Sequence, residues 1–155
     1  MMDEDKEKYR QEAIIPKAML VAIKGRKLLI HKILSAPGSK NMVRLPGGHI
    51  EFGEYSNETI VRETKEELGM KLYNPKLLGV LENIFKDEEK SMHHEIVFMY
   101  TGRLEKRAYE KEVIQAREGK MKFEMQWVSI DDIIKGKRIL VPKGSLKFVK
   151  EAERL

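Results

Sequence analysis

The sequence predicts an α/β protein in which a mixed β-sheet is flanked by helices. Short apolar runs rich in leucine and β-branched residues recur along the chain and are expected to form strands. Residues 57–69 hold no proline and show helical periodicity, and Pro142 is expected to begin a C-terminal helix. With 155 residues, 41% of them hydrophobic, the chain is long enough to form one domain around its own core.

The first part of the chain is expected to hold a β-hairpin and a short strand. Apolar runs at Ala18–Ile23 and Lys27–Leu34 flank the turn at residues 24–26, which predicts the hairpin. Ser35–Asn41 contains a proline and a glycine and is expected to be a loop. Met42–Leu45 then predicts a short strand.

The second part of the chain is expected to add three more strands. Lys76–Phe85 and Glu95–Leu104 are the two longest strand candidates, and Met121–Val128 is the third. More than half of the residues in Glu105–Lys120 are charged, so this segment is predicted to be a long loop or a short helix. Asp131–Ile134 is expected to start another short helix.

The helix predicted at residues 57–69 has two distinct faces. Ser56 is its expected N-cap, and Gly69 marks its end. At about 100° per residue, four residues fall on one apolar arc, namely Ile60, Val61, Thr64 and Leu68. Three carboxylates share a neighbouring arc, namely Glu63, Glu66 and Glu67. One face is therefore expected to pack, while the other concentrates negative charge.

The three co-facial glutamates suggest a divalent cation. Like charges three and four residues apart repel by a few tenths of a kcal/mol per pair (~0.2–0.5 kcal/mol). Mg²⁺ prefers oxygen ligands and sits between carboxylates and substrate phosphates. Just upstream, the glycine turn at residues 45–48 offers further backbone carbonyl and amide groups.

Residues 48–70 resemble the Nudix box. That motif is a glycine, five residues, a glutamate, seven residues, and then Arg-Glu-hydrophobic-x-Glu-Glu-x-Gly-hydrophobic. The matching residues are Gly48, Glu54, Arg62, Glu63, Glu66, Glu67, Gly69 and Met70. The one departure is Thr64, whose methyl group can pack while its hydroxyl bonds to a helix carbonyl.

Two other interpretations of this stretch stay open. An acidic, solvated helix can follow a glycine turn by chance. A Nudix-like domain can also bind nucleotides as a sensor without turning them over. Such domains usually carry broken glutamates, whereas every glutamate of the box is intact here.

The resemblance implies a fold, a reaction and a metal. The fold is the Nudix-type α/β/α sandwich of MutT-like proteins, as a single domain spanning residues 1–155 with a core at about residues 15–150. The reaction is hydrolysis of a nucleoside diphosphate linked to another moiety. Mg²⁺ or Mn²⁺ would be held by Glu63, Glu66 and Glu67 with the carbonyl of Gly47, while Arg62 pairs with Glu54 and orients the helix.

The resemblance leaves the general base and the substrate contacts open. The base is a box glutamate in some members and, in others, a glutamate before the last core strand. Among Glu105, Glu110, Glu112 and Glu118, we favour Glu112 and Glu118. Gly48, Glu82 and Phe85 are predicted to contact the substrate.

The substrate is expected to be a small anionic nucleotide, either a nucleoside triphosphate or a nucleotide sugar. ADP-ribose hydrolases carry a proline about fifteen residues beyond the box, where this chain has Phe85 and Lys86. The alternative is the 5′ end of RNA, since residues 135–155 hold seven basic and two acidic residues. The same tail also fits a solvated helix with Leu146, Val149 and Ala152 turned inward.

Composition excludes several other classes of protein. The chain has no cysteine, which rules out disulfides, thiolate nucleophiles and cysteine metal sites. Its charged first residues lack the apolar core of a signal peptide, and no eighteen apolar residues follow one another. We therefore expect a cytoplasmic monomer or homodimer that has no membrane partner.

Overall fold

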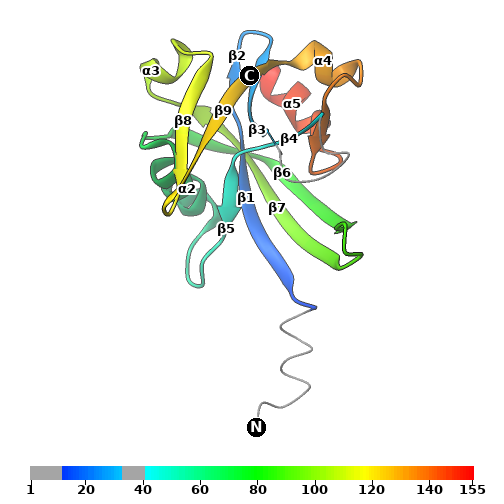
Figure 1. Ribbon diagram of the computed structural model, residues 1–155. Helices are drawn as coiled ribbons and strands as arrows, with labels where there is room; N and C mark the ends of the chain where they lie inside the picture. Colours follow the sequence, from blue (N-terminus) through cyan, green and yellow to red (C-terminus); the bar gives the residue numbers. More distant parts are fainter. Residues whose placement is uncertain (1–11, 33–40) are drawn as a thin grey trace.

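The computed structural model describes residues 12–32 and 41–155, in which two mixed β-sheets are combined with helices (Figure 1). The first sheet has the strand order β5-β1-β7-β6. Its strands are β1 (Ile14–Val21), β5 (Gly47–His49), β6 (Tyr73–Lys86) and β7 (Met92–Arg103). β1 and β7 run parallel, and the other neighbours are antiparallel.

The second sheet has the order β10-β4-β3-β9-β8, and β2 pairs with β3. The predicted hairpin is thus present only around its turn, because residues 18–21 of its expected first arm belong to β1 in the first sheet. Its strands are β2 (Ile23–Lys24), β3 (Lys27–Lys32), β4 (Met42–Arg44), β8 (Val113–Glu118), β9 (Met121–Ser129) and β10 (Ile139–Val141). The helices are α2 (Ser56–Leu68), α3 (Lys106–Tyr109), α4 (Ile130–Ile134) and α5 (Leu146–Glu153).

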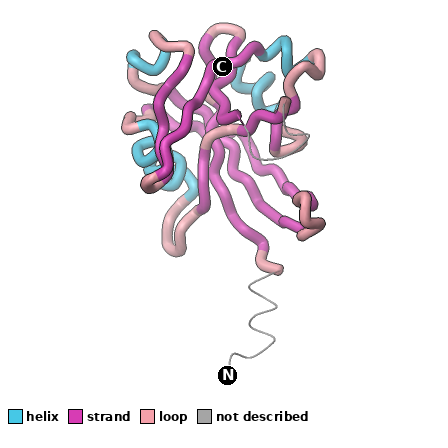
Figure 2. The backbone as a smooth tube through the Cα atoms, viewed as in Figure 1, coloured by secondary structure: helices cyan, strands magenta, loops and turns pink. Residues whose placement is uncertain are grey.

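Strand β1 lies at the centre of the molecule, between two apolar clusters. Ala18 and Leu20 pack in the cluster that contains Ile60 of α2. Met19 and Val21 point to the opposite face and join the cluster that contains Val149 of α5. α2 and α5 therefore cover opposite faces of the first sheet, and the predicted α/β class with a mixed sheet is confirmed (Figure 2).

Helix α2 begins one residue earlier than the sequence predicts. Its N-cap is Tyr55, whose backbone N–H donates to Glu58 Oε1 at 3.3 Å, whereas Ser56 is already helical. The Ser56 hydroxyl instead shares a 2.6 Å hydrogen bond with the Tyr100 hydroxyl. At the other end Gly69 adopts the left-handed conformation (φ 65°), as expected for a glycine that ends a helix.

The largest difference from the sequence-based prediction is strand β8. Glu105–Lys120 was expected to be a loop or a short helix, but it contains both α3 and β8. Within β8, Ile114 and Ala116 are buried while their neighbours are exposed. Pairing with β9 buries these alternate residues, whereas Val113, Gln115 and Arg117 on the other face are exposed. The charged residues that surround this strand in the sequence therefore obscured its period of two.

Two further boundaries differ. α5 begins at Leu146 and not at Pro142, which lies in the preceding turn and accepts a hydrogen bond from the Ser145 hydroxyl. β10 was not predicted. Residues 33–34 of the predicted hairpin and residues 35–40 of the predicted loop lie outside the described residues. In the part that is described, every helix is too short or too polar to cross a lipid bilayer.

Candidate active site

The box residues predicted from the sequence are brought together by β5, the loop after it, and α2. Glu54 lies in the loop, eight residues before Arg62 of the helix. Arg62 Nε donates to Glu54 Oε2 at 2.7 Å, and Arg62 Nη2 donates to Glu54 Oε1 at 3.0 Å. Paired guanidinium and carboxylate hydrogen bonds of this kind fix orientation as well as distance.

Arg62 also contacts the rest of the site. Its Nη1 donates to Glu63 Oε1 at 3.0 Å and to Glu66 Oε2 at 3.2 Å, and its Nη2 donates to the carbonyl of His49 at 3.1 Å. Hydrogen bonds from Arg62, and then from Thr59, lower the pKa of Glu54 to about 2. Arg62 thus ties β5, the loop and α2 into one unit.

Two adjacent glycines shape the floor of the site. Gly47 has φ 150°, and a Cβ there would collide with the carbonyl oxygen of Ala18 on β1. A Cβ on Gly48 would overlap the carboxylate of Glu63. Gly47 is therefore required for pairing with β1, and Gly48 leaves the space in which the Glu63 carboxylate lies.

Glu63 and Glu67 form a close pair of carboxylates. Burial, then a hydrogen bond with Glu63 and the charge of Glu63, raise the pKa of Glu67 to about 8, and the charge of Glu118 acts in the same direction. The nearby Arg44 opposes the shift. A partly buried carboxylate whose ionisation is hindered by a neighbouring carboxylate suits a hard cation, which favours the charged form.

The third glutamate is more exposed than this pair. Glu66 is 58% exposed and accepts from Arg62. Across residues 12–32 and 41–155, no three His, Cys, Asp or Glu side chains are gathered closely enough to hold an ion. The pair Glu63 and Glu67 fits a divalent cation by its chemistry. A fuller ligand set requires Glu66 or Glu118 to turn towards them.

Two residues near the glutamates were missed by the sequence reasoning. His31 of β3 stacks on Phe123 of β9 with ring centroids 4.3 Å apart, and its Nδ1 accepts from Arg44 Nε at 3.2 Å. Burial, then the charge of Arg44, lower the pKa of His31. His31 and Arg44 are paired across β3 and β4. The feature of the sequence that could have pointed to a role in the site was the position of Arg44, two residues before the proline of the glycine turn.

The two favoured candidates for the general base lie at opposite ends of β8. Glu118, at its end, is close enough to act on the pKa values of both Glu67 and His31. Glu112 precedes the strand and pairs with Lys27 at 2.8 Å and Lys24 at 3.5 Å. Six residues of strand correspond to about 20 Å. The structure therefore brings Glu118, and not Glu112, to the glutamate pair.

The chain matches the family model described as NUDIX domain over residues 16–151. It belongs to the NUDIX family. This membership confirms the resemblance that the box residues indicated.

Similar proteins of known sequence or structure agree with this membership. The chain is 33% identical over 93 residues to the uncharacterized Nudix hydrolase YvcI of Bacillus subtilis (strain 168), a match that covers 57% of this chain and 51% of YvcI. It thus spans about half the length of that curated relative. Its fold resembles the MutT protein of Bacillus halodurans (TM-score 0.62, 20% identity, 88% of this chain and 80% of that one). It also resembles the MutT protein of Methanosarcina mazei Go1 (TM-score 0.59, 21% identity, 91% of this chain and 94% of that one).

The predicted substrate contacts outside the NUDIX box lie on the β6–β7 hairpin. Glu82 is exposed and lies on the side of the first sheet that α2 covers. It is paired with Ile96, which shares a face of β7 with Phe98 and Tyr100, and these two residues pack in the cluster of α2. Phe85 points to the other side and stacks on His93 with ring centroids 4.8 Å apart. Contact of either residue with a substrate stays a prediction.

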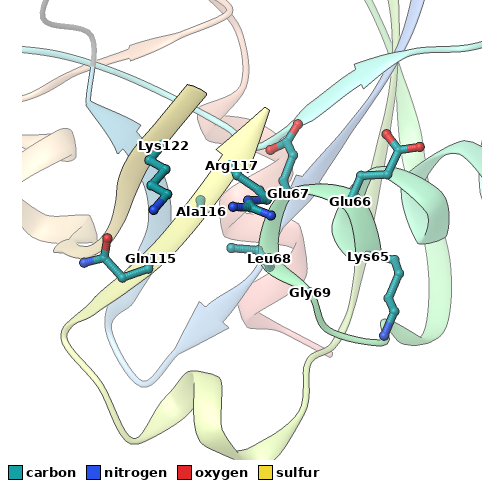
Figure 3. Close-up of a pocket in the computed structure, with 9 residues that line it drawn as sticks. All are labelled: Lys65, Glu66, Glu67, Leu68, Gly69, Gln115, Ala116, Arg117 and Lys122. Atoms are coloured by element: carbon teal, nitrogen blue, oxygen red, sulfur yellow. The ribbon is translucent and has the colours of Figure 1, made fainter. Parts of the chain in front are cut away.

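A cleft of about 450 Å³ lies beside the glutamates (Figure 3). One wall is the last part of α2, including Glu66 and Glu67, and the other is the β8–β9 hairpin, including Arg117 and Lys122. In Figure 3, Arg117 extends from β8 towards the end of α2. The basic C-terminal segment, by contrast, belongs to the layer of α5 on the opposite face of the first sheet. The basic groups that line this cleft therefore come from the hairpin and from Lys65 of α2.

Proposed function

We propose that this chain is a metal-dependent pyrophosphohydrolase that cleaves a diphosphate bond in a small nucleotide. The observation that carries the proposal is the pair Glu63 and Glu67. Glu63 lies against Gly48 and accepts a hydrogen bond from Arg62, which is itself held by Glu54. A partly buried pair of carboxylates is unfavourable by itself. A bound divalent cation offsets the repulsion between the two carboxylates and attracts an anionic substrate.

Glu63, Glu66 and Glu67, with the carbonyl of Gly47, would hold Mg²⁺ or Mn²⁺. When bound, such an ion neutralises charge that develops on phosphate oxygens and lowers the pKa of water. Arg62 keeps the first turns of α2 aligned with β5. Gly48 keeps the space beside Glu63 open.

Glu118 is the residue that we assign to proton transfer. A general base must reach the attacking water in its ionised form. Glu118 is exposed at the end of β8, and its charge contributes to the raised pKa of Glu67. Arg44, held by His31, supplies a positive charge beside the same carboxylates and is suited to bind a phosphate oxygen.

The substrate that we propose is a nucleoside triphosphate or a nucleotide sugar, acted on in the cytoplasm. Arg44 and the hairpin residues Arg117 and Lys122 supply positive charge around the glutamates for its phosphates. RNA is the less favoured substrate, because α5 and the basic tail belong to the layer on the other side of the sheet.

The test is release of phosphate or nucleotide from a panel with and without Mg²⁺ and Mn²⁺. The panel holds normal and oxidised dNTPs, ADP-ribose, nucleotide sugars, dinucleoside polyphosphates and triphosphorylated RNA. We expect metal-dependent turnover of a triphosphate or a nucleotide sugar. Glu67→Gln should lower it by roughly 100-fold or more, whereas Glu110→Gln, an exposed control, should not. Ligand binding without turnover by the wild-type chain would instead identify a sensor domain.

A further inference from the structure

The first sheet has an apolar face that none of the helices in residues 12–32 and 41–155 covers. β1, β6 and β7 extend well beyond the rest of the molecule (Figure 1), and this end lies past the helix α2. The large apolar side chains that are exposed on the described part of this sheet include Ile14 (53%), Val80 (48%), Ile84 (58%) and Met92 (64%). Contiguous apolar patches of this kind on a protein surface usually mark an interaction site.

Strand pairing places these side chains on one face and in regular rows. Alternate residues of a strand share a face, and Phe98 and Ala18 of the same alternation pack with α2. Three rows follow from the registers, Glu82–Ile96–Pro16, then Ile84–His94–Ile14, then Lys86–Met92. The middle row thus lies between an acidic residue and a basic residue of β6.

We propose that this face binds a second copy of the chain through a two-fold axis that runs along the middle row. Such an axis exchanges the two outer rows. Glu82 then faces Lys86 of the second copy, and Ile96 faces Met92 of the second copy. Glu82 and Lys86 each lie two residues from Ile84, about 7 Å along the strand, so both charge pairs form at once. The face is therefore self-complementary in charge and in apolar character.

The apolar character of the face favours the same occupant. Natural proteins protect exposed apolar faces against indiscriminate association, and a closed dimer is one means of doing so. The segment before β1 is a poor cover by composition, because seven of residues 1–11 are charged. A second copy satisfies both the apolar rows and the charges.

The first test is sedimentation velocity of the full chain over a range of concentrations. We expect a dimer, and we expect Ile84→Asp to raise its dissociation constant roughly 100-fold, because a buried charge then meets its own copy at the axis. The matched control is Ile134→Asp, since Ile134 is exposed on α4 (46%) and away from this face. Circular dichroism checks that each variant is folded.

The second test is a charge swap, which depends on the two-fold axis itself. Glu82→Lys and Lys86→Glu alone each place like charges opposite one another twice, and should weaken the dimer by about tenfold. The double variant Glu82→Lys/Lys86→Glu restores both pairs and should return to within about threefold of the wild type. A full chain that stays monomeric, or a dimer indifferent to Ile84→Asp or the swaps, would overturn the proposal. Dimerisation only after removal of residues 1–11 would assign the face to that segment instead.

Discussion

Arg62 holds Glu54 through two parallel hydrogen bonds, from Nε to Oε2 at 2.7 Å and from Nη2 to Oε1 at 3.0 Å. The same guanidinium reaches the carbonyl of His49 at the end of β5 and the carboxylate of Glu63 on α2. One side chain therefore sets the distance between the glycine turn and the glutamate helix. The geometry of the proposed metal site depends on it.

Arg62→Lys should impair the reaction while the fold remains. A lysine keeps the charge but cannot form the paired hydrogen bonds to Glu54 or reach His49 at the same time. We expect turnover or metal affinity to fall by about 10- to 100-fold, measured as kcat and as activity against Mg²⁺ concentration. Lys106→Gln, an exposed change on α3, is the control. An unaltered metal dependence in Arg62→Lys would show that Arg62 does not position the site.

Glu118→Gln and Glu112→Gln should separate the two candidate bases. If Glu118 accepts the proton from water, its replacement should lower kcat by roughly 100-fold or more and remove the acidic limb of the pH profile. Glu112→Gln should leave kcat close to the wild type, because the Glu112 carboxylate pairs with Lys24 and Lys27. The opposite pattern would move the base to Glu112.

The stability of the metal-free protein should fall as the pH rises through neutrality. The pKa of Glu67 is raised in the folded state from its ordinary 4.5 to about 8. Between these values the folded chain binds more protons than the unfolded chain, so the free energy of unfolding decreases with increasing pH. Glu67→Gln removes this group and should flatten the dependence. Urea denaturation in EDTA at pH 5, 6, 7 and 8 (values chosen to span roughly the shifted range) measures the slopes, and equal slopes in both proteins would contradict the assignment.

Gly47→Ala and Gly48→Ala should have different consequences. At Gly47 the added Cβ meets backbone of β1 in a conformation that favours glycine, so the free energy of unfolding should drop by about 2 kcal/mol or more. At Gly48 the added Cβ meets only the end of the Glu63 side chain, which can move aside. We therefore expect nearly wild-type thermal stability but roughly 100-fold lower kcat. Equal loss of Tm in both variants would refute this division.

Local periodicity explains why the box was predictable. The spacing of Arg62, Glu63, Glu66 and Glu67 fixes their relative positions once the segment is helical, whatever the rest of the chain does. Thr64 shows the same regularity, since it is buried and its hydroxyl donates to the Ile60 carbonyl at 2.7 Å. The helix end at Gly69 also depends only on local backbone geometry.

Strand β8 shows where local information is insufficient. The charged composition of Glu105–Lys120 suggests a loop, and only pairing with β9 gives Ile114 and Ala116 a buried face. The choice between Glu112 and Glu118 depends on the same pairing, because β8 carries one towards Lys27 and the other towards Glu67.

By itself, the sequence determined the family motif, the glutamate helix and the class of chemistry, because these depend on residues close together in the chain. Only the tertiary structure decided which distant residues join them. It brought Arg44 and His31 beside the glutamates, placed the basic tail in the layer on the other side of the sheet, and left Ile84 exposed among the described residues. These outcomes follow from strand order and register, which are set by long-range pairing and packing and cannot be obtained from spacing along the chain.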